Sequence, residues 1–341
     1  MKISIFVLGL SLALLVFSGS DLLAQASKEI SVSMLYGSGK YTYELVDEWA
    51  KLPQGWTFTD AAGIAIDSSD NVYILSRGTH PVTIWNRDGN LLGNWGESYF
   101  RRAHEATFGP DGNFWCTDDG NHTVTKFTPG GKVLQVLGTR DKPSDTGYVQ
   151  EQGLDSIKRS AGPFNRPTGV SVSPAGEVYV SDGYGNARVH KFASDGKLLF
   201  SWGEPGTGPG QFRLVHNVWL DTKGRVWVCD RENNRIQIFD TNGKFLNQWT
   251  HVSRPTAIFI DTDGVVYVAE LSARISIFDN NGKLLARWDD KVGGDPWKQV
   301  LVAPHGIAVD SRGDIYVAQV MMTIGKIEKG TRVVQKYVKR K

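Results

Sequence analysis

Apolar and polar positions alternate along this chain in short segments of strand length, and the same arrangement returns six times. In residues 214–246, two alternating segments flank a D-x-x-G turn at Asp221–Gly224, and two more follow a loop and a second turn at Asn242–Gly243. Short segments with a period of two are typical of half-buried β-strands. Each copy therefore predicts a four-stranded antiparallel meander, which is one blade of a β-propeller.

The aromatic residue of the second strand aligns the six copies. These aromatic residues are roughly 40 to 50 positions apart, with one longer interval, which is the period of propeller repeats. They are Tyr73, Trp115, Tyr179, Trp227, Tyr267 and Tyr316. We therefore expect an all-β fold, a six-bladed β-propeller with blades at residues 62–95, 104–137, 168–202, 216–249, 256–288 and 305–338.

Two segments compete for the strand that closes the ring. Residues 41–53 match the fourth-strand pattern and place Trp49 at the tryptophan position of that strand, and residues 333–338 also read as a strand. Pairing of either segment with the last blade would remove free sheet edges, and the sequence leaves their order open. An insertion at residues 139–164, between blades two and three, predicts either a functional loop on the rim or a disordered excursion.

The amino terminus has the features of a secretory signal peptide. Lys2 precedes an apolar run over residues 3–17, and Ala24-Gln25-Ala26 offers a small-residue cleavage site. We therefore expect residues 1–26 to be removed. Residues 27–341 would then form a single propeller domain that is secreted or periplasmic and has no membrane span.

Charge and cysteine content bear on the partners. The formal net charge of +2 at pH 7 gives no reason to expect a nucleic-acid partner. Cys116 and Cys229 fall in the second strands of blades two and four, which are not neighbours in the ring, so we expect two buried free thiols. We expect a monomer.

Three of the seven histidines occupy one equivalent position, where the chain enters the innermost strand of a blade. The six residues at this position are Ala62, His104, Thr168, His216, Thr256 and His305. Alternate blades of a six-bladed ring are related by a threefold rotation, so His104, His216 and His305 should converge on the axis. Three imidazoles with an open fourth position suit a catalytic zinc ion. Alternatively, they are packing or hydrogen-bonding residues at the mouth of the channel.

A second equivalent position follows the second strand, on the same side of the ring as the histidines. It holds Arg77 in blade one and Arg231 in blade four, and Tyr184 lies one residue further on in blade three. The guanidinium groups suit a substrate carboxylate, and the phenol suits proton transfer beside a metal ion. The alternatives are surface salt bridges for the arginines and an aromatic lid for the tyrosine.

Several segments carry a family resemblance. The blades resemble NHL repeats, and SDGYGNARVHKF at Ser181–Phe192 and VCDRENNRIQIF at Val228–Phe239 are similar to segments of peptidyl-α-hydroxyglycine α-amidating lyases. The resemblance extends over all six blades. It implies cleavage of the N–C bond of a peptidyl- or acyl-α-hydroxyglycine, which gives an amide and glyoxylate.

The resemblance also implies roles for individual residues. His104, His216 and His305 match the zinc ligands, Tyr184 matches the catalytic tyrosine, and Arg77 and Arg231 match the active-site arginines. The family also binds calcium through an aspartate directly after the third histidine. Gly306 stands at that position here, which argues against a calcium site. The sequence contains no copper monooxygenase domain, so we expect the peptide or small-molecule substrate to be made elsewhere.

Two other classes of protein share this fold. One is a non-enzymatic NHL-repeat propeller that acts as a protein-interaction scaffold, which leaves the threefold pattern of histidines unexplained. The other is a metal-dependent propeller hydrolase, such as a lactonase. Calcium-dependent sites of that kind use hard oxygen ligands, whereas the convergent position here carries imidazoles.

Overall fold

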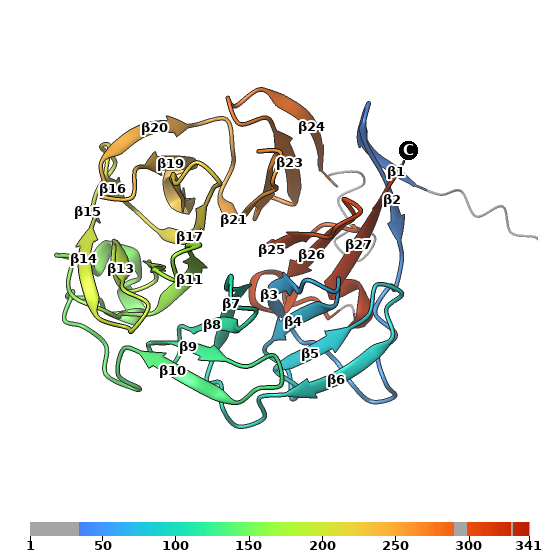
Figure 1. The fold of residues 1–341 in the computed structure, drawn as a ribbon, viewed down its shortest axis with the longest axis horizontal. Coiled ribbons are helices and arrows are strands. Elements are labelled where there is room, and N and C mark those ends of the chain that lie inside the picture. Colours follow the sequence, from blue (N-terminus) through green and yellow to red (C-terminus); the bar gives the residue numbers. More distant parts are fainter. Residues whose placement is uncertain (1–33, 290–298, 329, 341) are drawn as a thin grey trace, which may run out of the picture. The chain divides into compact units, whose positions relative to one another are not determined.

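The computed structural model of the protein describes residues 34–289, 299–328 and 330–340. Over these residues the chain forms six antiparallel sheets arranged around a central axis (Figure 1). The prediction of an all-β, six-bladed propeller is confirmed. The predicted signal peptide, residues 1–26, lies outside the described residues.

Blades one to five are each a meander of four strands in chain order. Blade one consists of β3 (Ala61–Ile66), β4 (Val72–Ser76), β5 (Val82–Trp85) and β6 (Leu91–Trp95). Blade two consists of β7 (Ala103–Phe108), β8 (Phe114–Asp118), β9 (Thr123–Phe127) and β10 (Val133–Leu137). Blade three consists of β11 (Pro167–Val172), β12 (Val178–Asp182), β13 (Arg188–Phe192) and β14 (Leu198–Trp202).

Blades four and five follow the same order. Blade four consists of β17 (Val215–Leu220), β18 (Val226–Asp230), β19 (Arg235–Phe239) and β20 (Phe245–Trp249). Blade five consists of β21 (Pro255–Ile260), β22 (Val266–Glu270), β23 (Arg274–Phe278) and β24 (Leu284–Asp289). The first strand of each blade faces the axis (Figure 1).

Blade six joins the two ends of the chain. Its order from the axis outward is β25 (Pro304–Val309), β26 (Ile315–Gln319), β27 (Val334–Lys339), β2 (Tyr41–Val46) and β1 (Leu35–Ser38). Both candidate segments therefore take part in closure: the carboxy-terminal strand is third, and the amino-terminal strand is fourth. The hairpin partner β1 covers the edge that β2 would otherwise expose.

Trp49 occupies the tryptophan position that its segment predicted. Its indole donates a hydrogen bond to the Arg87 carbonyl, 2.8 Å away, in the turn between the third and fourth strands of blade one. Trp95 does the same one blade further on, with the Pro129 carbonyl at 3.0 Å. Both indoles pack against the turn glycine of the next blade, Gly89 and Gly131, and Trp202 and Trp249 make the same contact with Gly243 and Gly282.

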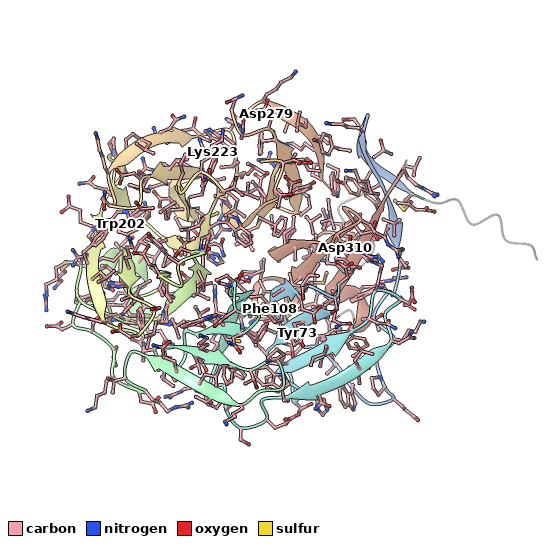
Figure 2. The ribbon with its side chains drawn as sticks, viewed as in Figure 1. Tyr73, Phe108, Trp202, Lys223, Asp279 and Asp310 are labelled. Carbon is pink, nitrogen blue, oxygen red and sulfur yellow. The ribbon has the colours of Figure 1, made fainter. Side chains whose placement is uncertain are left out.

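Apolar clusters fill the spaces between adjacent blades, and the six aligning aromatic residues are buried in them. In Figure 2, Tyr73 of blade one lies beside Phe108 of blade two, and their ring centroids are 4.9 Å apart. Cys116 and Cys229 are buried free thiols, as predicted. The core thus lies between blades rather than within any one of them.

Short elements occupy the connections. A two-stranded parallel pair joins β15 (Glu204–Pro205) to β16 (Gln211–Phe212). The helical segments are η1 (Gln150–Gln152), η2 (Leu154–Ser156), η3 (Arg231–Asn233), α2 (Met321–Gly325) and η4 (Gly330–Val333). In the described part of the chain, no helix has the length and apolar character needed to cross a membrane.

Candidate metal centre

The three histidines are the second residues of β7, β17 and β25. In each of these strands the pairing register shifts across the histidine, so that the residue sits in a β-bulge; in β7, Ala103 faces Asp118 and Glu105 faces Thr117. Bulges commonly re-aim a side chain away from the regular pleat. The imidazole centroids of His104, His216 and His305 are 4.7–4.9 Å apart.

The intervening blades orient these imidazoles. His104 Nδ1 lies 2.6 Å from the Thr168 carbonyl, and His216 Nδ1 lies 2.7 Å from the Thr256 carbonyl. His305 Nδ1 lies 2.7 Å from the Ala62 carbonyl. Because a carbonyl oxygen only accepts hydrogen bonds, each Nδ1 carries the proton, and each Nε2 presents a lone pair. Histidines that bind metal ions are commonly fixed in this way through the other ring nitrogen.

The electrostatic setting keeps the imidazoles neutral. His104, His216 and His305 are at most 1% exposed, and loss of solvation lowers the pKa of each one well below its usual value. Nearby positive charge, including that of Arg77, lowers these pKa values further. One nitrogen from each ring lies within 4.8 Å of the others. Three neutral nitrogens at this spacing could hold a metal ion.

Tyr184 lies over two of the three imidazoles, on the loop that follows β12. Its hydroxyl is 3.0 Å from His104 Nε2 and 3.2 Å from His216 Nε2. Arg231 Nη1 lies 3.5 Å from the same hydroxyl. The structure therefore brings Tyr184 to two of the three histidines.

The insertion at residues 139–164 holds the Tyr184 loop in place. The Thr146 hydroxyl donates a hydrogen bond to the Gly185 carbonyl at 2.5 Å, and the Gly185 amide donates to the Asn165 carbonyl at 3.0 Å. A Cβ atom at position 185 would lie 2.2 Å from Asn165 Oδ1, so a larger residue there would displace the Asn165 side chain from its hydrogen bonds with Ser144 and Thr146. The insertion is thus a support for the site.

The two predicted arginines reach the same end of the channel, and both are also engaged in ion pairs. Arg77 pairs with Asp60 at 3.3 Å, and its Nε donates a hydrogen bond to the Ala103 carbonyl at 3.2 Å. Its Nη2 is buried and has no hydrogen-bond partner. Arg231 pairs with Glu232 at 2.8 Å. Arg77 therefore retains an unused donor for a ligand.

Two further arginines, Arg102 and Arg166, were not singled out by the sequence. Their guanidinium carbons lie 5.6 Å and 5.5 Å from the centroid of the Tyr184 ring, within the range of a cation–π contact. Both pair with the buried Asp119, at 2.6 Å and 2.8 Å. The repeat alignment could have indicated this group. Asp119 holds the same position in its blade as Arg77 and Arg231, and Arg102 and Arg166 both lie two residues before the position of the histidines.

The arginines make this end of the channel attractive to anions. A cavity of about 360 Å³ opens beside Arg77 and Arg102, and Arg101 and Lys326 also line it. Among the described residues that line it, Asp60 is the only acidic one, and it already pairs with Arg77. The cavity reaches Ala103, the residue before His104, but none of the three histidines is among its described lining residues. A small carboxylate would therefore find compensating charge beside Arg77.

Comparison with known proteins places the chain in a family. The NHL repeat model matches residues 164–192 and 212–239. NHL repeat-containing protein 3 of Homo sapiens is 31% identical over 341 residues, which cover 94% of this chain and 90% of that protein. This chain belongs to the NHL repeat family. The repeats that the sequence pattern indicated are confirmed.

NHL-repeat relatives of this chain include the lyases that its motifs resemble. Peptidyl-alpha-hydroxyglycine alpha-amidating lyase 1 of Drosophila melanogaster is 31% identical over 174 residues, which cover 47% of this chain and 29% of that protein. A solved gluconolactonase structure from Xanthomonas campestris has a TM-score of 0.62 at 12% identity, covering 89% of this chain and 94% of that one. The latter similarity concerns the fold alone.

Proposed function

We propose that this chain is a zinc-dependent lyase that cleaves the N–C bond of a peptidyl- or acyl-α-hydroxyglycine, giving an amide and glyoxylate. One observation carries the proposal: three neutral imidazoles, each fixed through Nδ1 by a carbonyl of the next blade, face the Tyr184 hydroxyl. The similarity to an amidating lyase supports the choice of reaction.

The donor set fits zinc. His104, His216 and His305 would hold the ion and leave a position for substrate or water. A bound zinc ion supplies Lewis acidity, which lowers the pKa of a substrate hydroxyl. The one cluster of metal-binding side chains among the described residues contains histidines only, which favours zinc over calcium.

Tyr184 would move the proton. In the substrate, R-CO-NH-CH(OH)-COO⁻, the hydroxyl proton would pass to the oxygen of Tyr184, acting as the phenolate, as the C=O bond of glyoxylate forms. The N–C bond breaks with its electron pair on nitrogen, and nitrogen takes up a proton to give R-CO-NH₂. The proton count balances when Tyr184 returns what it received, so no oxidant or reductant is needed.

Arg77 would bind the substrate carboxylate. Its buried Nη2 lacks a partner, and a carboxylate placed there would satisfy that donor with a charge-assisted hydrogen bond. Arg231 reaches the Tyr184 hydroxyl and would help to hold a negative charge beside it. Arg102 and Arg166 add positive charge over the Tyr184 ring while Asp119 holds them in position.

The test uses the mature chain without a polyhistidine tag and α-hydroxyhippurate as substrate. Metal analysis is expected to give about one zinc per chain, and turnover is expected to release benzamide and glyoxylate in equal amounts. Benzamide is the diagnostic product. A hydrolase acting on the amide bond would give benzoate, and the α-hydroxyglycine so released also breaks down to glyoxylate. Benzoate without benzamide, or zinc without turnover, would contradict the lyase proposal.

A further inference from the structure

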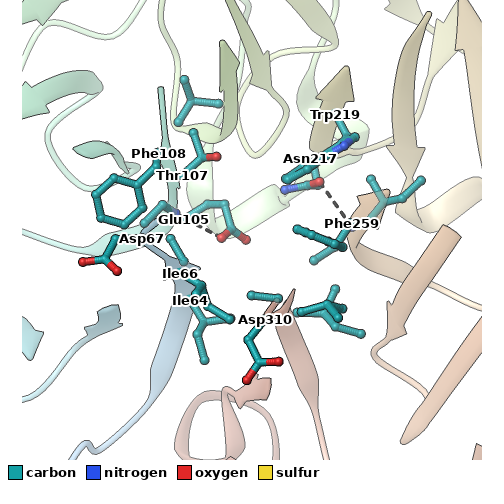
Figure 3. Close-up of a pocket in the computed structure, with 18 of the residues that line it drawn as sticks. Ile64, Ile66, Asp67, Glu105, Thr107, Phe108, Asn217, Trp219, Phe259 and Asp310 are labelled. Atoms are coloured by element: carbon teal, nitrogen blue, oxygen red, sulfur yellow. Dashed lines mark hydrogen bonds between the residues drawn. The ribbon is translucent and has the colours of Figure 1, made fainter. Parts of the chain in front are cut away.

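A second cavity occupies the other end of the central channel. Its volume is about 310 Å³, and it extends from the residue after His104 to the turns that follow the innermost strands (Figure 3). Its walls are mainly apolar and come from all six blades; they include Ile64, Phe108, Val170, Trp219, Phe259 and Ile307. This volume exceeds that of cavities of about 150 Å³ that are known to bind benzene.

The carboxylate of Glu105 lies in this cavity with one oxygen that has no hydrogen-bond partner. The carboxylate of Glu105 points into the space between the strands (Figure 3), and the residue is 5% exposed. Its Oε1 accepts a hydrogen bond from the Ala106 amide at 3.0 Å. The Ile64 amide also faces the carboxylate, but Oε2 has no hydrogen-bond partner. An unpaired buried carboxylate oxygen is costly, so such groups normally have a partner.

The other carboxylates that line the cavity contrast with Glu105. Asp67 accepts hydrogen bonds from the Asn71 side chain and from two backbone amides. Asp70 and Asp310 both pair with Arg87. Only Glu105, among the described lining residues, offers a carboxylate oxygen that nothing engages. No lysine, arginine or histidine is among the described residues that line the cavity, so a cation that paired with Glu105 would come from outside the chain.

The chemistry of the lining residues determines which kind of cation the cavity can bind. Calcium takes six to eight oxygen ligands. Asn217 holds the position equivalent to Glu105 in blade four, and its side-chain oxygen accepts a hydrogen bond from the Ile258 amide at 3.4 Å. Apolar walls and the Trp219–Phe259 ring pair, with centroids 5.0 Å apart, instead suit a hydrophobic body. We propose that this cavity binds an organic cation, a primary amine on an apolar or aromatic body, whose ammonium group pairs with Glu105.

The test is calorimetric titration of the metal-loaded chain with 2-phenylethylamine and with 2-phenylethanol, which has the same body without the charge. The amine is expected to bind with a Kd of about 0.1–1 mM, and the alcohol at least about 10-fold more weakly. Glu105→Gln should remove this preference for the amine. Glu204→Gln, an exposed glutamate outside the cavity, should keep it.

Two further variants keep the proposal falsifiable if Glu105→Gln does not fold. Val309→Phe enlarges a side chain that lines the cavity. It should weaken the binding of both probes, while the amine still binds more tightly than the alcohol. His216→Ala should retain amine binding, which separates this cavity from the metal centre and from the proposed reaction. Equal affinity for amine and alcohol would overturn the proposal. So would calcium binding that depends on Glu105 and displaces the amine.

Discussion

The two ends of the central channel are built from consecutive residues of the same strands and yet differ in chemistry. At one end, His104 and its equivalents are buried, each has a fixed hydrogen-bond partner, and nearby arginine charge lowers their pKa values. At the other end, Glu105 faces apolar walls with one oxygen unpaired. A propeller can therefore place two unlike binding environments on one axis, because each innermost strand contributes one side chain per level.

The largest effect is expected at the metal centre. His216→Ala removes one of three ligands, and we expect the chain to lose stoichiometric zinc and all measurable benzamide release. His251→Ala, which changes an exposed histidine outside the centre, serves as the control. Metal analysis of both variants checks this. Retention of zinc by His216→Ala would show that the imidazole end does not bind the ion in the way proposed.

Tyr184→Phe separates proton transfer from metal binding. We expect kcat to fall by about 10²–10⁴-fold, the usual contribution of a general acid–base group, while the zinc content stays at one per chain. Tyr99→Phe is the matched control, because its hydroxyl bonds Thr125 away from the centre. An equal loss in both variants would point to a packing role for Tyr184.

Arg77→Lys tests whether the unpaired guanidinium nitrogen selects the substrate carboxylate. Lysine keeps the charge but not the planar fork, so we expect kcat/KM to fall by about 10–100-fold, mainly through KM, for a substrate that carries a carboxylate. Arg213→Lys, an exposed arginine, should leave both parameters within about twofold. No change in KM for Arg77→Lys would contradict the proposed role.

Thr146→Val tests the support that the insertion gives to Tyr184. The loss of one hydrogen bond of about 1 kcal/mol should lower kcat by roughly fivefold and leave KM and zinc content unchanged. Thr42→Val is the control, because its hydroxyl also bonds a backbone carbonyl but lies on the outer strand β2. A fall in zinc content instead would place the effect of Thr146 on the histidines.

The smallest effect concerns the unpaired carboxylate. Glu105→Leu replaces a buried polar group by an apolar one of similar size, and we expect the free energy of unfolding to rise by about 1 kcal/mol. Asp310→Asn is expected to lower it, because that carboxylate accepts hydrogen bonds from Arg87 and Tyr316. Chemical denaturation measures both. If both variants lower the free energy of unfolding, the unpaired carboxylate of Glu105 is not less favourable than the hydrogen-bonded carboxylate of Asp310, and the prediction is wrong.

The sequence by itself determined the repeat and therefore the equivalence of positions. Once six copies were aligned on their aromatic residues, rotational symmetry carried His104, His216 and His305 to one point on the axis, and Arg77, Arg231 and Tyr184 to the same side. This succeeded because a propeller converts an interval along the chain into a rotation in space. The same rotation about the axis relates every pair of equivalent positions in neighbouring blades.

Only the tertiary structure decided what depends on contacts between blades. The order of the closing strands, the grouping of Arg102, Arg166 and Asp119, and the hold of Thr146 on the Tyr184 loop all join residues of different blades or loops. The unpaired oxygen of Glu105 likewise depends on which amides the neighbouring strands present. Strand periodicity says which face a side chain takes, but hydrogen-bond partners depend on distances that only the closed ring sets.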